Sequence, residues 1–164
     1  MSMYFHLRAV PPGHLRDDVR WLEGLFRDDW ETVRERIGRH REEVLDKLYL
    51  DHELLYAGSP PHHVADGPPA QVVLGGRPVF HSAHGLPPFL LLTAAETERV
   101  SVYLGAADFD ELWRTSRGGL LPRYGGSDAE PEARAVFAAA HRDLTAFYTQ
   151  TAHYGDAVVK WLVL

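Results

Sequence analysis

The alternation of apolar and polar positions predicts a β-strand at each end of the chain. Residues 3–10, MYFHLRAV, alternate with a period of two until Pro11 and Pro12 interrupt the pattern. Such a period places successive side chains on opposite faces of a sheet, and proline ends the pairing. Residues 156–164, DAVVKWLVL, are almost continuously apolar and predict a final buried strand.

Helical spacing of apolar residues dominates the chain between these strands. Pro12 can open a first helix, because the N–H that proline lacks is not needed in a first turn. A second, long helix is predicted from Trp30 to Gly58, bent near Gly38. Thr93 and Glu96 form a capping-box pattern at the start of a third helix. Further helices are expected at residues 108–113 and 131–153.

The order of these elements predicts the fold class. A loop rich in proline and glycine at residues 59–70 is followed by short extended segments, including FLLL at 89–92. Strand, helices, short strands, helices and strand in this order indicate an α+β fold. We expect a mostly helical single domain over residues 1–164, with the helices packed on one small sheet that contains the N- and C-terminal strands.

Composition excludes several classes of function. The chain has no cysteine, which excludes disulfides, cysteine-bound zinc, iron–sulfur clusters and a thiol nucleophile. The net charge of −6 opposes general binding to nucleic acid, which depends on cationic contacts to phosphate. Arginines in residues 34–43 alternate with acidic residues, as on a solvated helix face. No signal-peptide core and no run of apolar residues long enough to cross a bilayer is present. We therefore expect a cytoplasmic protein with no membrane or nucleic-acid partner.

Several short motifs, in a fixed order over nearly the whole chain, point to a known family. They are MSMYF at the start, LDKLY at 45–49, VVLGG at 72–76, GLPPFLLLT at 85–93 and LTAFYTQTAHYGDAVVKWL at 144–162. With these motifs the chain resembles the YfbM-like family, a bacterial family of unknown function. The resemblance implies a compact α+β domain and no established activity.

The chain also departs from the family pattern at positions that carry polar residues. Where the family has Trp, often His, and a second His, this chain has Tyr49, Leu50 and Glu53. His52 lies one residue away from the family register, which turns it by about 100° on a helix. Leu90 stands where the family tends to have Arg. If those residues form a shared site, this chain has lost or altered it. The residues that do match are Asp46, Lys47, Gly58, Gly75 and Thr93.

The polar residues of the segment 45–58 are the main candidates for a site. On a helix, Tyr49, His52 and Glu53 have i, i+3, i+4 spacing, and Asp46 lies one turn earlier. Together with Lys47 they could line a cleft and act as acid, base and hydrogen-bond donor. The alternative is that Asp46, Lys47 and Asp51 form a solvated edge while Tyr49 packs in the core.

Four histidines in loops raise the question of a metal site. His62, His63, His81 and His84 offer imidazoles, to which Asp51 or Glu53 could add a carboxylate. No HExxH motif is present, and adjacent histidines in polar loops are usually solvated. No G-x-S-x-G motif or P-loop spacing occurs either. We expect no metal and no cofactor.

These observations favour a non-catalytic binding or regulatory module, with neutralisation of a partner protein as one form of that role. Aromatic residues near loops and helix ends, which can anchor a partner, are Trp30, Trp113, Tyr124 and Tyr154. The partner would be a protein or a small molecule. The alternative function is a small enzyme or ligand-binding protein with a polar cleft on the segment 45–58. The sequence leaves the oligomeric state open.

Overall fold

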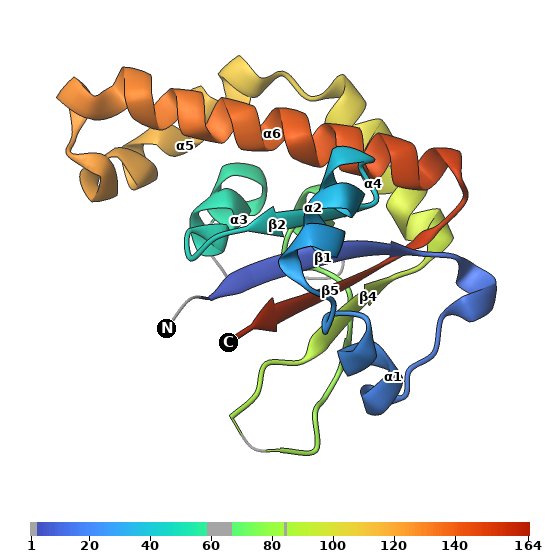
Figure 1. The fold of residues 1–164 in the computed structure, drawn as a ribbon. Helices are drawn as coiled ribbons and strands as arrows, with labels where there is room; N and C mark the ends of the chain where they lie inside the picture. Colours follow the sequence, from blue (N-terminus) through green and yellow to red (C-terminus); the bar gives the residue numbers. More distant parts are fainter. Residues whose placement is uncertain (1–2, 59–66, 84) are drawn as a thin grey trace.

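The fold is a five-stranded antiparallel sheet combined with six α-helices (Figure 1). The computed structural model describes residues 3–58, 67–83 and 85–164, and the counts refer to these residues. The strands are β1 (Tyr4–Val10), β2 (Glu42–Leu45), β3 (Arg77–Val79), β4 (Phe89–Leu92) and β5 (Ala157–Val163). Their order across the sheet is β2-β1-β5-β4-β3, so the two terminal strands lie side by side in the middle.

The α-helices are α1 (Val19–Gly24), α2 (Trp30–Gly38), α3 (Tyr49–Ala57), α4 (Ala94–Ala106), α5 (Phe109–Leu120) and α6 (Glu130–His153). Short 3₁₀ helices are η1 (Pro12–His14), η3 (Pro68–Gln71), η4 (Leu121–Tyr124) and η5 (Ser127–Ala129). Figure 1 shows α6 crossing one side of the sheet, with α1 on the opposite side. The predicted α+β class, mostly helical with both terminal strands in the sheet, is confirmed.

The alternation predicted for the terminal strands produces two cores, one on each face of the sheet. Phe5 and Leu7 of β1 face the larger core, which α3 to α6 cover, whereas Val10 faces the smaller core with α1. The larger core includes Phe137, Leu144, Phe147, Tyr148 and Val158. The smaller core consists of Val10, Leu22, Phe89, Leu91 and Val159. Each buried aliphatic or aromatic side chain stabilises the fold by about 1.5–3 kcal/mol relative to exposure.

The prediction of one long helix from Trp30 to Gly58 is wrong. Helix α2 ends at Gly38, and His40 takes a left-handed conformation with φ of 57°. The N–H of Arg41 then donates to the carbonyl of Arg36 at 2.8 Å, which closes a helix-ending turn. Strand β2 follows and pairs with β1 before α3 begins. Hydrogen bonding to a strand distant in sequence outweighs the local helical spacing of the apolar residues. The periodicity within residues 30–58 does not reveal such a partner strand.

The first helix also differs from its prediction. Pro12 opens only the short helix η1, and α1 begins at Val19, where the side chain of Asp18 accepts a hydrogen bond from the N–H of Arg20 at 2.8 Å. This cap starts the helix later than its apolar spacing suggests.

The later helices begin where they were predicted. Thr93 and Glu96 form the expected capping box at the start of α4. The helix expected at residues 108–113 extends to Leu120 as α5, and α6 covers the range predicted for the long helix. Among the described residues, no helix combines the length and apolar character that crossing a membrane requires.

Candidate functional site

The five candidates of the segment 45–58 do not share one helix face. Asp46 and Lys47 are exposed and precede α3. The Asp46 carboxylate accepts a hydrogen bond from the N–H of Leu48 at 2.8 Å and so forms the turn into the helix. The ring of Tyr49 stacks on Phe5, with 5.3 Å between centroids. Tyr49 therefore packs against the core.

Glu53 belongs to a buried polar network that fastens the segment 68–75 to the sheet. Its Oε2 accepts a hydrogen bond from the N–H of Leu74 at 2.8 Å. Lys160, fully buried on β5, donates to the carbonyl oxygens of Gln71 and Gly75. Burial lowers the pKa of Lys160 to about 7, against the opposing effect of the carboxylates of Glu53 and Glu96.

Two of the positions that depart from the family pattern lie close to Lys160. Leu90 is paired with Lys160 across β4 and β5, and the charge of Glu53 acts on the Lys160 ammonium. Leu50, by contrast, is 54% exposed on α3. The altered positions are therefore not gathered at one place.

Asp46 and His52, however, line one pocket between β2, the start of α3 and α6. We call it the acidic pocket; its volume is about 240 Å³. Its lining residues are Glu43, Val44, Leu45, Asp46, Leu48, His52, Val136, Ala140 and Asp143. Burial, with a smaller effect of Asp143 and Glu42, raises the pKa of Glu43 to about 7. Glu43 is thus a carboxyl group that exchanges its proton near neutral pH.

His52 is the most enclosed polar group of the acidic pocket. The side chain is 4% exposed, and its ring lies 4.8 Å from that of Phe137. Its Nδ1 is buried and makes no hydrogen bond within the described residues. Burial lowers the pKa of His52, against the effect of Asp46 and Asp51, and favours the neutral imidazole. A neutral imidazole offers one hydrogen-bond donor and one acceptor.

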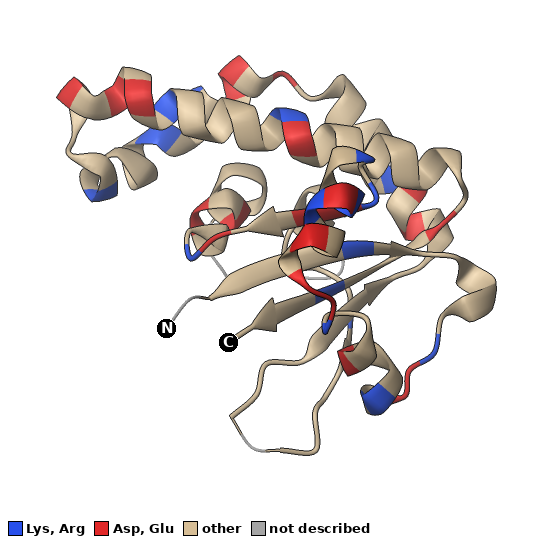
Figure 2. Cartoon of the chain, in the orientation of Figure 1, with Lys and Arg blue, Asp and Glu red and all other residues tan. Residues whose placement is uncertain are grey.

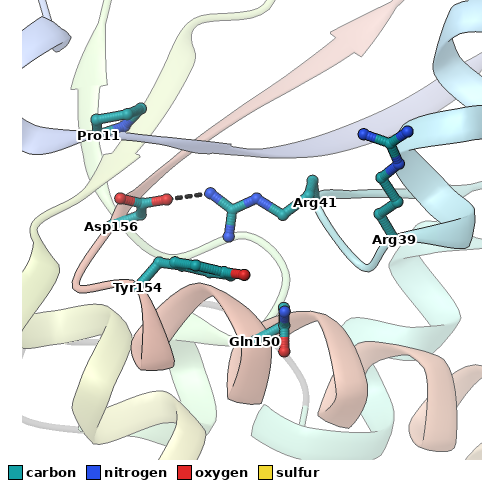
Figure 3. Close-up of a pocket in the computed structure, with 6 residues that line it drawn as sticks. All are labelled: Pro11, Arg39, Arg41, Gln150, Tyr154 and Asp156. Atoms are coloured by element: carbon teal, nitrogen blue, oxygen red, sulfur yellow. Dashed lines mark hydrogen bonds and ion pairs between the residues drawn. The ribbon is translucent and has the colours of Figure 1, made fainter.

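A larger pocket lies where β1, the α2–β2 turn and the α6–β5 turn meet (Figure 3). We call it the arginine pocket; its volume is about 690 Å³. Its lining residues are Pro11, Arg39, Arg41, Gln150, Tyr154 and Asp156. The backbone turns that present them depend on positive φ angles at His40 and at Gly155 (67°).

Arg41 is the central group of the arginine pocket. It forms an ion pair with the buried carboxylate of Asp156, and its guanidinium carbon lies 4.8 Å from the centre of the Tyr154 ring. Figure 3 shows the guanidinium beside the Asp156 carboxylate and over the Tyr154 ring. Its Nη1 is buried and has no hydrogen-bond partner among the described residues. Arg39 extends away from this pair (Figure 3) and binds Glu35 at 2.6 Å.

Most of the arginine pocket was not predicted from the sequence. The arginines of residues 34–43 were expected on a solvated helix face, and Figure 2 does show acidic and basic residues interspersed along α2 and α6. Tyr154 was among the aromatic candidates, and it is 60% exposed. Trp113, in contrast, is buried, and Tyr124 donates to Asp51 at 2.9 Å. The alternation of charges gave no signal that one arginine faces Asp156 from across the fold.

The histidines considered for a metal site are only partly described. His62, His63 and His84 lie outside the described residues. His81 contacts the carboxylate of Glu23 through Nε2, an ion pair when the imidazole is protonated. Within residues 3–58, 67–83 and 85–164, no three His, Asp or Glu side chains are placed to hold a metal ion together.

Comparison with solved structures identifies the fold. A crystal structure described as a protein of unknown function, YfbM, from Escherichia coli matches this chain with a TM-score of 0.63. The match covers 99% of this chain and 100% of that chain at 16% sequence identity. The chain has the YfbM fold. The resemblance predicted from the motifs is therefore confirmed at the level of the fold.

The YfbM likeness carries no activity to this chain, because the matched protein is itself described as of unknown function. No protein-family model and no curated protein matches the chain. The pockets of this YfbM-like fold are therefore the features that bear on its function.

Proposed function

We propose that this protein is a non-catalytic binding module whose ligand is a small molecule with a carboxylate or phosphate group, held in the arginine pocket. The observation that carries the proposal is the placement of Arg41, which presents a buried Nη1 without a described partner at a pocket of about 690 Å³. That volume is in the usual range for small-molecule sites, so we favour a small molecule over a protein partner.

The charge of the lining supports an anionic ligand. The lining contains two arginines, Arg39 and Arg41, and a single acid, Asp156, so it carries a net positive charge in a chain with a net charge of −6. The guanidinium fork matches two oxygens of a carboxylate or phosphate. Asp156 occupies one side of the Arg41 fork and leaves Nη1 for a ligand. Exposed ion pairs such as Arg39–Glu35 contribute at most about 1 kcal/mol, so Arg39 can turn toward the ligand.

The exposed ring of Tyr154 supports a planar group next to the anion. One face of this ring contacts the Arg41 guanidinium, and the side chain lines the pocket. Aromatic pairs contribute about 0.5–1.5 kcal/mol beyond their buried area. An aromatic acid or aryl phosphate would therefore gain from both the arginine and the tyrosine.

Calorimetric titration with phenyl phosphate and benzoate tests the proposal, with benzylamine as the cationic control. Arg39→Ala and Tyr154→Ala should each weaken binding about tenfold. The matched control is Arg34→Ala, which removes an exposed arginine of α2 that does not line the pocket. No saturable binding of either anion, or an equal loss with Arg34→Ala, would contradict the proposal.

We also propose a cytoplasmic location and no nucleic-acid ligand. The support is compositional: the chain has no cysteine and a net charge of −6. Cell fractionation tests the location, and a binding titration with duplex and single-stranded DNA at low salt tests the second statement.

A further inference from the structure

The acidic pocket gathers negative charge from three parts of the chain. Glu43 comes from β2, Asp46 from the connection to α3 and Asp143 from α6. No lysine or arginine is among its described lining residues. Glu43 is only 8% exposed, so its carboxylate is little screened by water. The pocket therefore attracts a cation, whereas the arginine pocket attracts an anion.

His52 provides an independent indication of a ligand. Buried polar groups in folded proteins are nearly always hydrogen-bonded, and each exception calls for an explanation. His52 is buried and lines the acidic pocket, and its Nδ1 has no hydrogen-bond partner within the described residues. A ligand with N–H donors would supply the missing bond, because the neutral imidazole can accept one.

The remaining walls of the acidic pocket are apolar and determine the shape of the ligand. They are formed by Val44, Leu45, Leu48, Val136 and Ala140. The volume of about 240 Å³ is below the range usual for drug-sized ligands, so the occupant must be short. A ligand with a cationic group on a short aliphatic chain fits this lining, because the cation can contact the carboxylates and the chain can contact the apolar walls.

We propose that the acidic pocket binds a protonated primary amine on a short aliphatic chain. The ammonium group is held in the negative field of the acidic lining residues Glu43, Asp46 and Asp143 and donates one hydrogen bond to His52. The chain lies along Val136 and Ala140. Such an ammonium belongs either to a free small amine or to a lysine side chain of a peptide.

This site is separate from the arginine pocket, although both lie along α6. Asp143 and Val136 belong to one stretch of the helix, and Gln150 of the arginine pocket lies further along it. Arg41 directly precedes β2, and Asp46 directly follows it. Loss of one site therefore leaves the residues of the other in place.

The test is a calorimetric titration of the whole chain at low salt and pH 8 with butylamine, N-acetyl-lysine amide and Mg²⁺. Asp143→Asn is the informative variant, because Asp143 is exposed and its replacement leaves the core intact. Glu132→Gln is the matched control: it also removes an exposed acid of α6, but outside the pocket. We expect saturable amine binding that Asp143→Asn weakens about tenfold and Glu132→Gln leaves unchanged.

The outcomes distinguish a free amine from a lysine side chain, and distinguish both from a metal ion or an effect of overall charge. Tighter binding of butylamine supports the proposal with a free amine as ligand, and tighter binding of N-acetyl-lysine amide supports it with a lysine side chain. Absence of saturable amine binding overturns the proposal. An equal loss with Glu132→Gln overturns it too, because the effect would then be one of overall charge. Mg²⁺ binding at least as tight as that of both amines would show a metal site instead.

Discussion

The ammonium nitrogen of Lys160 donates a hydrogen bond of 2.9 Å to the carbonyl oxygen of Gly75. A second bond of 2.5 Å reaches the carbonyl oxygen of Gln71. Lys160 is fully buried on β5, the central strand of the sheet, so these bonds fasten the segment 68–75 to the middle of the fold. The backbone carbonyls at this point replace the water that the ammonium loses on burial.

Replacement of Gly75 by alanine should lower the free energy of unfolding by about 3 kcal/mol. An added Cβ would lie 2.2 Å from the carbonyl oxygen of Ala70 and 2.6 Å from the Cα of Gln71. Both are backbone atoms, so the segment that binds Lys160 must shift. Urea unfolding measures the effect.

The control for this prediction is Gly118→Ala within α5. A Cβ there meets nothing within 4 Å, and alanine is favoured over glycine in a helix by about 0.5–1 kcal/mol. The control should therefore stabilise the protein. Equal effects of the two changes would contradict the close packing around Gly75.

Lys160→Met should change how stability depends on pH. The pKa of Lys160 in the fold is about 7, below its ordinary value of 10.5, so between these values the unfolded chain binds the proton more strongly. Native stability therefore rises with pH over this range, by about 4 kcal/mol between pH 7 and pH 10. The variant lacks this contribution. Unfolding curves of both proteins from pH 7 to pH 10 measure the difference, and parallel curves would show that Lys160 stays charged in the fold.

Glu43→Gln should stabilise the protein at high pH and not at low pH. The pKa of Glu43 is raised to about 7 from 4.5, so the folded chain holds the proton more strongly, and stability falls as pH rises from 4.5 through 7. Above pH 7 the ionised carboxylate, which is buried and also close to Asp143 and Glu42, costs about 3 kcal/mol. Glutamine removes this cost. Thermal unfolding at pH 4 and pH 8 is the measurement.

Glu132→Gln, at an exposed position of α6, is the comparison for the Glu43 variant. It should shift the melting temperature little and similarly at both pH values. A Glu43 variant that behaves like it would show that Glu43 titrates at an ordinary pKa.

His40→Gly should raise the free energy of unfolding by about 1 kcal/mol. His40 has a φ of 57°, a conformation that costs most residues about 1–2 kcal/mol and glycine nothing. His40→Ala separates the backbone effect from loss of the imidazole, because alanine keeps the strain. Chemical unfolding of the original protein and the two variants measures the free energy of unfolding. If alanine raised it as much as glycine does, the imidazole side chain and not the backbone conformation would be the unfavourable feature.

The polar cleft predicted on residues 45–58 corresponds only in part to a pocket of the structure. Asp46 and His52 do line one pocket, but Glu43 and Asp143, which join them there, come from a strand and a distant helix. The assumption of one continuous helix placed Glu43 on the wrong element, so its contact with Asp143 could not be anticipated. Arg41 and Asp156 are separated by 115 positions, and no local spacing predicts such an ion pair.

By itself, the sequence determined the elements whose signals are local. The alternation of β1, the apolar run of β5, the capping box of Thr93 and Glu96 and the length of α6 depend on neighbours a few residues apart. The tertiary structure alone decided that residues 42–45 form a strand, because their hydrogen bonds go to β1. It also decided both pockets, since charge and burial at each depend on side chains brought together from separate elements. Interactions between residues close in sequence determine most helices and strands of this protein. Contacts between residues distant in sequence determine where its polar side chains meet.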